Sequence, residues 1–541
     1  MLNLAHGLTF ADLHSVEGTR RIDALFADHL RTAAPALADR LQAGRDAPDA
    51  LAAKAESELL IALAPHLEDF VAALFGIAPE VQALEARHHE LAPLFAVKRQ
   101  FVQRKAMNAH KAEVAATFDG PALRAELETV VGAPFSELAF ATAVTGWLSD
   151  QQHDETAHAA ALDLAARYAA WAAHTPAGRA AHRGGVLFRA PRKLDYMKLV
   201  PVAAEPLDGV SAWKLPSDHA LRQRDGFALT DAGTDFVGGL DQAHYCIWCH
   251  EQGKDSCARG LLEKKPIEGD VPFKKSPFNV TLAGCPLDER ISEFHKLRAE
   301  GVPLGALAMI CIDNPMVAAT GHRICNDCMK SCIYQKQDPV DIPQSETRLL
   351  KDVLALPWGF EVYSLLTRWN PLNLRQPLPA ARTGKRVLIV GMGPAGFTLA
   401  HHLINDGHTV VAIDGLKIEP LNPALSGITI AGERLPFQPV RDTASLMDPL
   451  DDRVMAGFGG VAEYGITVRW DKNFLKMIRL LLERRDRFAL YGGVRFGGTL
   501  DDAGAFAMGF DHIALATGAG KPTVLDRPTA WPMACAPRRI S

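Results

Sequence analysis

The chain has 541 residues, a formal net charge of −5, 48% hydrophobic residues and 22% charged residues. This length allows about three domains with cores of their own, and the composition is typical of a globular protein in water. The acidic balance argues against a nucleic-acid partner. The sequence has no apolar run long enough to span a membrane and no signal peptide, so we expect no membrane association and a cytoplasmic location.

Residues 1–185 are rich in alanine and carry apolar residues at helical spacing, as in Ile22, Leu25, Phe26 and Leu30. This spacing predicts a helical domain of six or more amphipathic helices. The pattern indicates no chemistry of its own, and docking of a partner subunit is one possible role. Residues 186–240 mix short β-like runs with Pro, Gly and Asp, and we interpret them as a linker or irregular region.

Eight of the nine cysteines lie between Cys246 and Cys332. Clustered cysteines in a chain without an export signal indicate metal or cofactor ligation rather than disulfides. Thiolates in this number suit iron–sulfur clusters, and they also suit two structural zinc ions. The interleaved groups and the Cys285-Pro286 pair favour clusters over zinc.

A glycine-rich loop follows an apolar run at Val387–Val390. The predicted order is a buried strand, the loop, a helix, and a second strand that ends at an acid, which is the fingerprint of a dinucleotide-binding Rossmann unit. The glycines permit a tight turn and close approach of a pyrophosphate to the helix N-terminus, and the acid can bind a ribose hydroxyl. The pattern fits FAD or NAD, and its residues are Gly391, Gly393, Pro394, Ala395, Gly396 and Asp414.

The order of these motifs resembles the small chain of glutamate synthase and the N-terminal region of dihydropyrimidine dehydrogenase. The resemblance covers roughly residues 241–520 and rests on the cysteine groups, the Gly284-Cys285-Pro286 motif, the segment from Pro339 to Ile342, and the glycine loop. It implies a multidomain chain. An α-helical ferredoxin-like domain with two [4Fe-4S] clusters, residues 241–382, would precede an α/β Rossmann-type FAD domain, residues 383–541.

The resemblance also implies how the ligands are shared. One cluster would take Cys246, Cys249, Cys257 and Cys332, and the other would take Cys285, Cys325, Cys328 and, as its fourth ligand, Glu346. Two spacings differ from the family, because Cys249 and Cys257 lie further apart and Cys325 and Cys328 lie closer together. The partition at Cys257 and Cys328 therefore stays open. Cys311 matches no ligand position and is expected to be a small buried hydrophobe.

Further flavin-site residues follow from the same resemblance: Gly460 and Gly465 in a glycine-rich segment, and Thr517 and Gly518 after a strand at 510–516. Between them, the pattern predicts an amphipathic helix over Lys472–Tyr491 and a short strand at Val494–Phe496. The family's NAD(P)H domain has no counterpart here, so the FAD domain is expected to be incomplete. The tail from Pro528 to Ser541 reads like a frameshifted remnant of a longer domain.

These expectations predict an electron-transfer flavoprotein oxidoreductase that passes electrons between FAD and two [4Fe-4S] clusters, originally from NAD(P)H, and onward to a redox partner or second subunit. Two alternatives remain open. One is an iron–sulfur carrier or catalytically incomplete fragment without a stable flavin, and the other is a zinc-stabilised scaffold.

Overall fold

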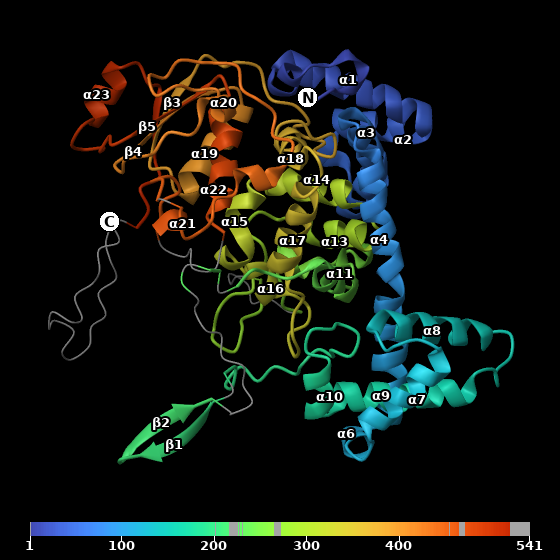
Figure 1. The fold of residues 1–541 in the computed structure, drawn as a ribbon. Coiled ribbons are helices and arrows are strands. Elements are labelled where there is room, and N and C mark those ends of the chain that lie inside the picture. The colour runs from blue at the N-terminus through green and yellow to red at the C-terminus, as the bar shows by residue number, and fades with distance from the viewer. Residues whose placement is uncertain are drawn as a thin grey trace.

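The computed structural model describes residues 2–200, 202–215, 226, 228–229, 231–264, 272–453, 455–464 and 471–519, without the side chains of 321–324 and 464. Figure 1 shows a helical body with a small sheet on one flank and a group of helices reaching away from the body on the other. No helix in the described part of the chain is long and apolar enough to cross a membrane.

The segment up to residue 185 is helical, as expected. Its main helices are α1 (Val16–Ala33), α2 (Pro35–Asp46), α3 (Ala53–Phe75), α4 (Ala78–Val97), α6 (Ala112–Ala115), α7 (Gly120–Val131), α8 (Glu137–Asp150), α9 (Ala159–His174) and α10 (Pro176–Ala181). Ser15 caps α1 by accepting the N–H of Gly18 at 2.9 Å, which satisfies a donor left free at the helix start. Ile22, Phe26 and Leu30 then bury one face of α1 completely.

These helices contribute to two separate hydrophobic cores. The helices α1–α3 share a core with the central helices of the chain, where Phe26 and Phe70 pack edge to face or tilted against the buried Trp369. The second core joins the end of α4, the helices α7–α9 and the segment around Phe188. The helix α4 continues into a π-helix, η4 (Lys98–Ala106), and spans both cores.

The central part of the chain is a set of shorter helices that carries the cysteines: α11 (Phe236–Tyr245), α12 (Ser256–Arg259), α13 (Ile291–Ala299), α14 (Pro303–Asp313), α15 (Val317–Ile324), α16 (Asp327–Ser331), α17 (Ile342–Leu354) and α18 (Gly359–Leu366). The fully buried Arg298 of α13 ties two of them together, because it binds Asp352 of α17 at 3.0 Å. Before this part, β1 (Ala203–Leu207) and β2 (Val210–Lys214) form an antiparallel hairpin that projects from the body (Figure 1).

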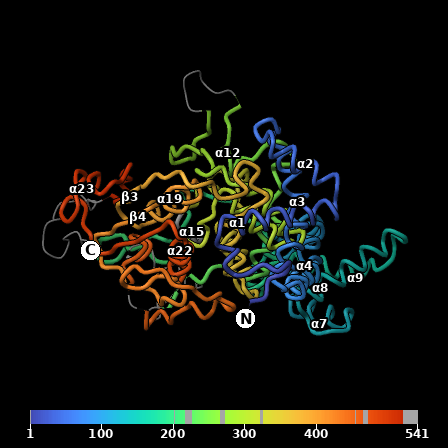
Figure 2. The backbone as a smooth tube through the Cα atoms, turned by 90° about the horizontal axis from the view of Figure 1, so that it is seen from above, coloured from blue at the N-terminus to red at the C-terminus, as the bar shows by residue number. Residues whose placement is uncertain are grey.

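The sheet on the other flank has four parallel strands in the order β5-β4-β3-β6. They are β3 (Arg386–Val390), β4 (Thr409–Asp414), β5 (Phe488–Gly492) and β6 (His512–Leu515), with α19 (Pro394–Asn405) between β3 and β4 and α22 (Asn473–Glu483) before β5. Both faces of β3 are covered. Val387 and Ile389 belong to the large core, and Leu388 and Val390 to a small one that includes Ala505 of α23 (Asp502–Ala507). Figure 2 shows this layer beside the central helices.

Two sequence expectations were wrong in this region. The helix expected over Lys472–Tyr491 ends at Glu483, and the chain then forms β5, whose backbone pairs with β4. The expected strand at Val494–Phe496 is absent from the described residues, where Phe496 makes only an isolated bridge to Leu500. The last expected strand is present as β6. The tail from Pro528 to Ser541 lies outside the described residues. The domain boundaries stay predictions.

Candidate functional site

Four of the expected cysteine ligands line one small cavity. Its walls also include apolar side chains such as Ile291 and Ile342, and the four cysteines are Cys246, Cys249, Cys257 and Cys332. The thiols surround the cavity rather than meet at one point: among the described residues, no group of three or more His, Cys, Asp or Glu side chains is close enough to hold a single metal ion. The structure thus brings together four residues that are separated by up to 86 positions in the sequence (246 to 332).

Local backbone geometry presents these thiols. Cys246 directly follows α11, and Trp248 adopts a left-handed conformation (φ 52°) that turns the chain so that Cys249 faces the same cavity. Cys332 ends α16, and the backbone N–H groups of residues 333, 334 and 340 point at its sulfur. Burial raises the pKa of Cys246 to about 12 and that of Cys249 to about 11. Binding of a metal would therefore have to displace protons from these thiols.

The second expected ligand group is also brought together. The charges of Glu346 and Cys325 act on Cys285 and on Cys328, which shows that the four side chains are neighbours. Cys328 and Glu346 are buried and Cys325 is exposed. Burial raises the pKa of Glu346 to about 7, while Asn314 donates to its carboxylate at 2.8 Å.

A second carboxyl, that of Glu289, belongs to the same group but carried no sequence signal. Glu289 is 4% exposed, and burial together with the charge of Glu346 raises its pKa well above the usual value. Cys311 lies near both carboxyls, is 5% exposed, and has its pKa raised by burial. Its neighbours are thus more polar than a purely apolar packing role suggests.

A backbone hydrogen bond links the two ligand groups. The N–H of Cys285 donates to the carbonyl oxygen of Cys257 at 2.8 Å, so a residue of one group is bonded to a residue of the other. Gly284 makes this approach possible, because it has φ 88° and an added Cβ would lie 2.4 Å from the carbonyl oxygen of Ala258. The glycine before Cys285 is thus required both by backbone conformation and by space.

The glycine loop lies between β3 and α19. Gly391 has φ 99°, and an added Cβ there would lie 2.4 Å from the carbonyl oxygen of Ala516. A Cβ on Gly396 would lie 1.9 Å from the carbonyl oxygen of Gly391, so that helix and strand could not pack. At Gly393 the nearest atoms are 3.8 Å away, which leaves this position open. Pro394 and Ala395 form the first turn of α19.

Two other expected residues, Asp414 and Gly460, lie beside this loop. Asp414 accepts the N–H of Met392 at 2.9 Å through one carboxylate oxygen, so the acid at the end of β4 is bonded to the loop. Gly459 donates to the carbonyl oxygen of Met392 at 3.0 Å, and Gly460 lies against Gly393.

The segment after β6 borders the same loop. Thr517 and Gly518 directly follow Ala516, whose carbonyl oxygen faces Gly391. Gly465 lies outside the described residues. The expected flavin residues that the structure describes therefore lie on segments that surround one loop.

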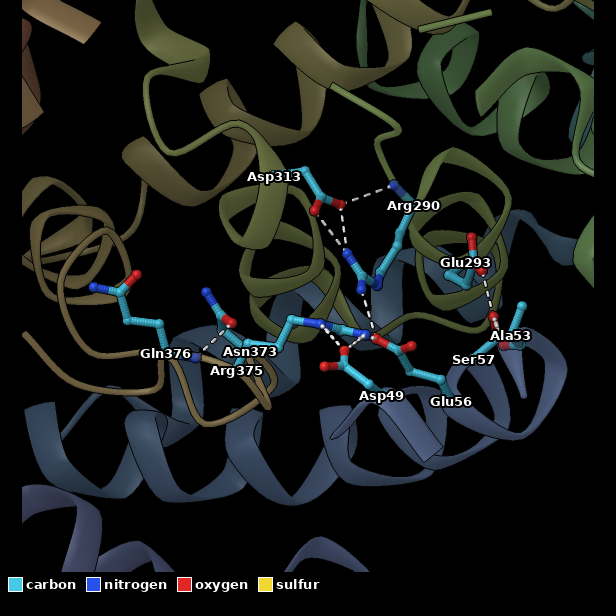
Figure 3. Close-up of polar contacts among 10 residues, drawn as sticks. All are labelled: Asp49, Ala53, Glu56, Ser57, Arg290, Glu293, Asp313, Asn373, Arg375 and Gln376. Atoms are coloured by element: carbon cyan, nitrogen blue, oxygen red, sulfur yellow. Dashed lines mark hydrogen bonds and ion pairs between the residues drawn. The ribbon is translucent and has the colours of Figure 1, made fainter. Parts of the chain in front are cut away.

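Another cavity, of about 480 Å³, lies between α3, the start of α13 and the connection from α18 to β3. Figure 3 shows the ion pairs on its wall. Arg290 binds Asp313 at 2.7 Å and Glu56 at 2.6 Å, and Glu56 also accepts from Arg375 at 3.0 Å. Burial opposes ionisation of Glu56, but the two arginines hold its pKa below the usual value. These charges satisfy one another and tie α3 to the helices that carry the cysteines.

Comparison with known proteins gives matches to separate parts of the chain. Residues 4–76 match a family model described as the RP005 N-terminal alpha-helical domain. The chain is 52% identical over 211 residues to the uncharacterized protein RP006 of Rickettsia prowazekii (strain Madrid E), which covers 39% of this chain and 28% of RP006. It is 28% identical over 309 residues to the uncharacterized protein RP005 of the same organism, which covers 55% of this chain and 99% of RP005.

A third relative has a functional name. The chain is 32% identical over 224 residues to the glutamate synthase [NADPH] small chain of Bacillus subtilis (strain 168), a match that covers 41% of this chain and 36% of that protein. The chain thus spans little more than a quarter of RP006 and about a third of the glutamate synthase small chain. The chain is also 27% identical over 221 residues to the putative oxidoreductase YgfK of Escherichia coli (strain K12), a match that covers 40% of this chain and 18% of that protein. These distant relatives support a general redox role.

Proposed function

We propose that the chain is an electron-transfer oxidoreductase module that holds two [4Fe-4S] clusters and FAD. The observation that carries this proposal is the convergence of Cys246, Cys249, Cys257 and Cys332 on one cavity. Four cysteine thiolates around a small enclosed space, with few other polar groups, match the ligand set of a [4Fe-4S] cluster. When bound, such clusters accept and release single electrons.

The chain's own groups fit this role in a second way. Backbone N–H groups point at the sulfur of Cys332 and, from residues 287 and 289, at the sulfur of Cys285. Hydrogen bonds to ligand sulfurs and burial in an apolar shell are the means by which a protein adjusts the potential of a cluster. The walls of the first cavity would exclude water, and the N–H groups would stabilise the negative charge on the thiolates.

For the second cluster, the neighbouring ligands are Cys285, Cys325, Cys328 and Glu346. Glu289 lies beside them and would compete for a proton or for the metal, so the fourth ligand of this cluster is one of two carboxyls. The exposed position of Cys325 places one corner of this site near solvent.

For FAD, support comes from the sheet order and from the loop. With β3 as the first strand, the order β5-β4-β3-β6 is that of half of a doubly wound nucleotide-binding sheet, and the loop at Gly391 lies at its switch point between β3 and β6. The N-terminus of α19 would face the pyrophosphate, and the open space at Gly393 would admit it. Asp414 would bind the ribose through lone pairs that its two backbone hydrogen bonds leave free. NAD(P)H is the hydride source that the resemblance implies.

The test is anaerobic reconstitution with iron and sulfide, followed by metal analysis and a visible spectrum. We expect broad absorbance, about eight irons per chain and flavin bands. Cys332→Ala should lose about half of the iron or more, because it removes one ligand of the first cavity. The matched control Cys311→Ala, another buried cysteine, should keep all of it.

Other outcomes would support the alternative functions. Iron without flavin would point to an iron–sulfur carrier, and a colourless zinc protein to a scaffold. Equal iron content in Cys332→Ala and Cys311→Ala would refute the assignment of the first cavity.

A further inference from the structure

A further cavity, here called the outer cavity, borders the inner cavity that the first cysteine group lines. It measures about 130 Å³ and is lined by side chains of η4, of α11 and of the loop at 334–337, among them Arg99, Gln103, His244 and Tyr245. Tyr334 lines this outer cavity and also the inner cavity that the four cysteines share. One aromatic side chain therefore forms the wall between the two cavities.

A second aromatic ring supports this wall. The ring of Tyr334 stacks on the ring of Tyr245, with centroids 4.6 Å apart and planes at 12°. Tyr245 directly precedes Cys246, and Tyr334 follows Cys332 by two positions. Gln337 donates to the hydroxyl of Tyr245 at 2.6 Å, which holds this ring in place. The stacked tyrosines thus connect the backbone of two cysteines to the floor of the outer cavity.

The mouth of the outer cavity is basic. Arg99 and Gln103 both line it, because residues four apart lie on the same side of the π-helix. π-Helical turns are rare and are frequent at functional sites. Arg99 is exposed, and its positive charge acts on Tyr334 and on His244.

Further cations flank the same mouth. Lys193 and Lys336 are exposed, and Lys193 pairs through a β-bridge with Gln337, a residue that lines the cavity. Among the described residues, no ion pair engages Arg99, Lys193 or Lys336. The nearby acids are already paired, Asp241 with Lys98 at 2.5 Å and Asp338 with Arg192 at 3.3 Å. The mouth therefore carries uncompensated positive charge.

We propose that this basic mouth is the docking site of a small acidic one-electron carrier protein, and that electrons leave the first cysteine group through the tyrosine wall. The proposal rests on the proposed function. The cysteines of the first group would hold the iron–sulfur centre, which would be oxidised by one electron while the carrier is reduced by one, with no bond or proton exchanged. A hydride donor of the NAD(P)H class would supply the electrons by way of the flavin.

The position of the second cysteine group agrees with this direction. Cys325 directly follows α15, and α15 packs on α22 of the sheet region, so the second group is joined to that region through α15. The first group borders, through Tyr334, the outer cavity that residues of η4 and α11 line. Entry of electrons through the second group and exit through the first would use the two groups in series.

The test uses the full chain and an acidic plant-type [2Fe-2S] ferredoxin as the probe. Binding is measured by calorimetry at low and high ionic strength, with and without reconstituted iron. We expect the dissociation constant to rise by about tenfold or more in Arg99→Glu/Lys336→Glu. The control Arg20→Glu/Arg495→Glu changes the net charge equally at exposed positions elsewhere and should stay within about twofold of the native chain.

Carbodiimide crosslinking supplies a second readout. It should join carboxylates of the ferredoxin to Lys193 or Lys336, as identified by mass spectrometry. If the chain carries its iron but both double variants bind ferredoxin like the native chain, the docking site is wrong and the proposed function stands. If reconstitution leaves no iron, both fail.

Discussion

The buried ion pair between Glu361 and Arg484 joins α18 to the chain just after α22, and its removal gives the sharpest prediction about stability. Both side chains are 1% exposed, and Arg484 binds both carboxylate oxygens of Glu361, at 3.0 and 3.1 Å. Arg484→Met leaves the buried carboxylate without the cation that is hydrogen-bonded to it, and Arg368 is then the remaining cation that acts on it. Breaking such a pair costs about 3–5 kcal/mol.

The size of the effect should depend on the remaining charge. Glu361→Gln keeps an acceptor for the N–H of Val440, which donates to the native carboxylate at 2.7 Å. In the double variant Glu361→Gln/Arg484→Met neither charge of the pair remains, so we expect it to recover on the order of 2 kcal/mol relative to Arg484→Met alone.

The pH dependence has a definite sign. Burial raises the pKa of Glu361, and Arg484 opposes that shift. In Arg484→Met the folded-state pKa rises further, and the stability of a group with a raised folded-state pKa is lost as the pH rises through it. The defect should therefore be larger at pH 8 than at pH 5. Urea denaturation followed by circular dichroism measures the free energy of unfolding of each variant at both pH values. If the effects of the two single substitutions add up in the double variant, and if the defect is the same at pH 5 and pH 8, the reasoning is refuted.

Three further predictions concern single positions. Burial raises the pKa of Glu68 to about 8, although the N–H groups at the start of α14 oppose this shift. The stability that the protonated carboxyl contributes is therefore lost as the pH rises through 8. In urea denaturation, the stability of Glu68→Gln relative to the native chain should therefore increase between pH 5 and pH 9. At Gly391 the backbone has φ 99° and an added Cβ would lie 2.4 Å from a carbonyl oxygen. Gly391→Ala should therefore lower the free energy of unfolding by about 2 kcal/mol or more and reduce the flavin absorbance. The control Gly415→Ala, with open space around the position, should keep the native stability and absorbance. Lys98→Met leaves the buried Asp241 short of its closest cation and should lower the free energy of unfolding by about 3 kcal/mol; a thermal melt unchanged from that of the native chain would contradict this.

Local patterns in the sequence predicted most of the helices because one turn of a helix is built from neighbouring residues. The helix expected over Lys472–Tyr491 shows where this reasoning stops. Its apolar spacing holds to Glu483, but Phe488–Gly492 becomes a strand because its backbone pairs with β4. That partner lies about 80 residues away, as in Val410 opposite Phe488, and nothing local specifies it.

The candidate site was predictable to the extent that residue type determines chemistry. Cysteine spacing and motif order singled out the residues that line the inner cavity. Neither Glu289 nor the stacked pair of Tyr245 and Tyr334 could be found in this way, because a glutamate or a tyrosine is common and only tertiary packing buries or stacks it. The N–H groups that face Cys332 are equally invisible, because every residue except proline has one.

The helix α3 has a consequence for how this chain can be divided. Its residues Leu63, Leu67 and Phe70 are at most 2% exposed and belong to the same core as Trp369 and the cysteine-bearing helices. A shortened chain that began at residue 241 would lack α3 and would expose to water the apolar side chains of α13 and α14 that pack against it. We therefore expect the region from residue 241 onward to be expressed in soluble form only together with the first helices, supplied either in the same polypeptide or as a second one.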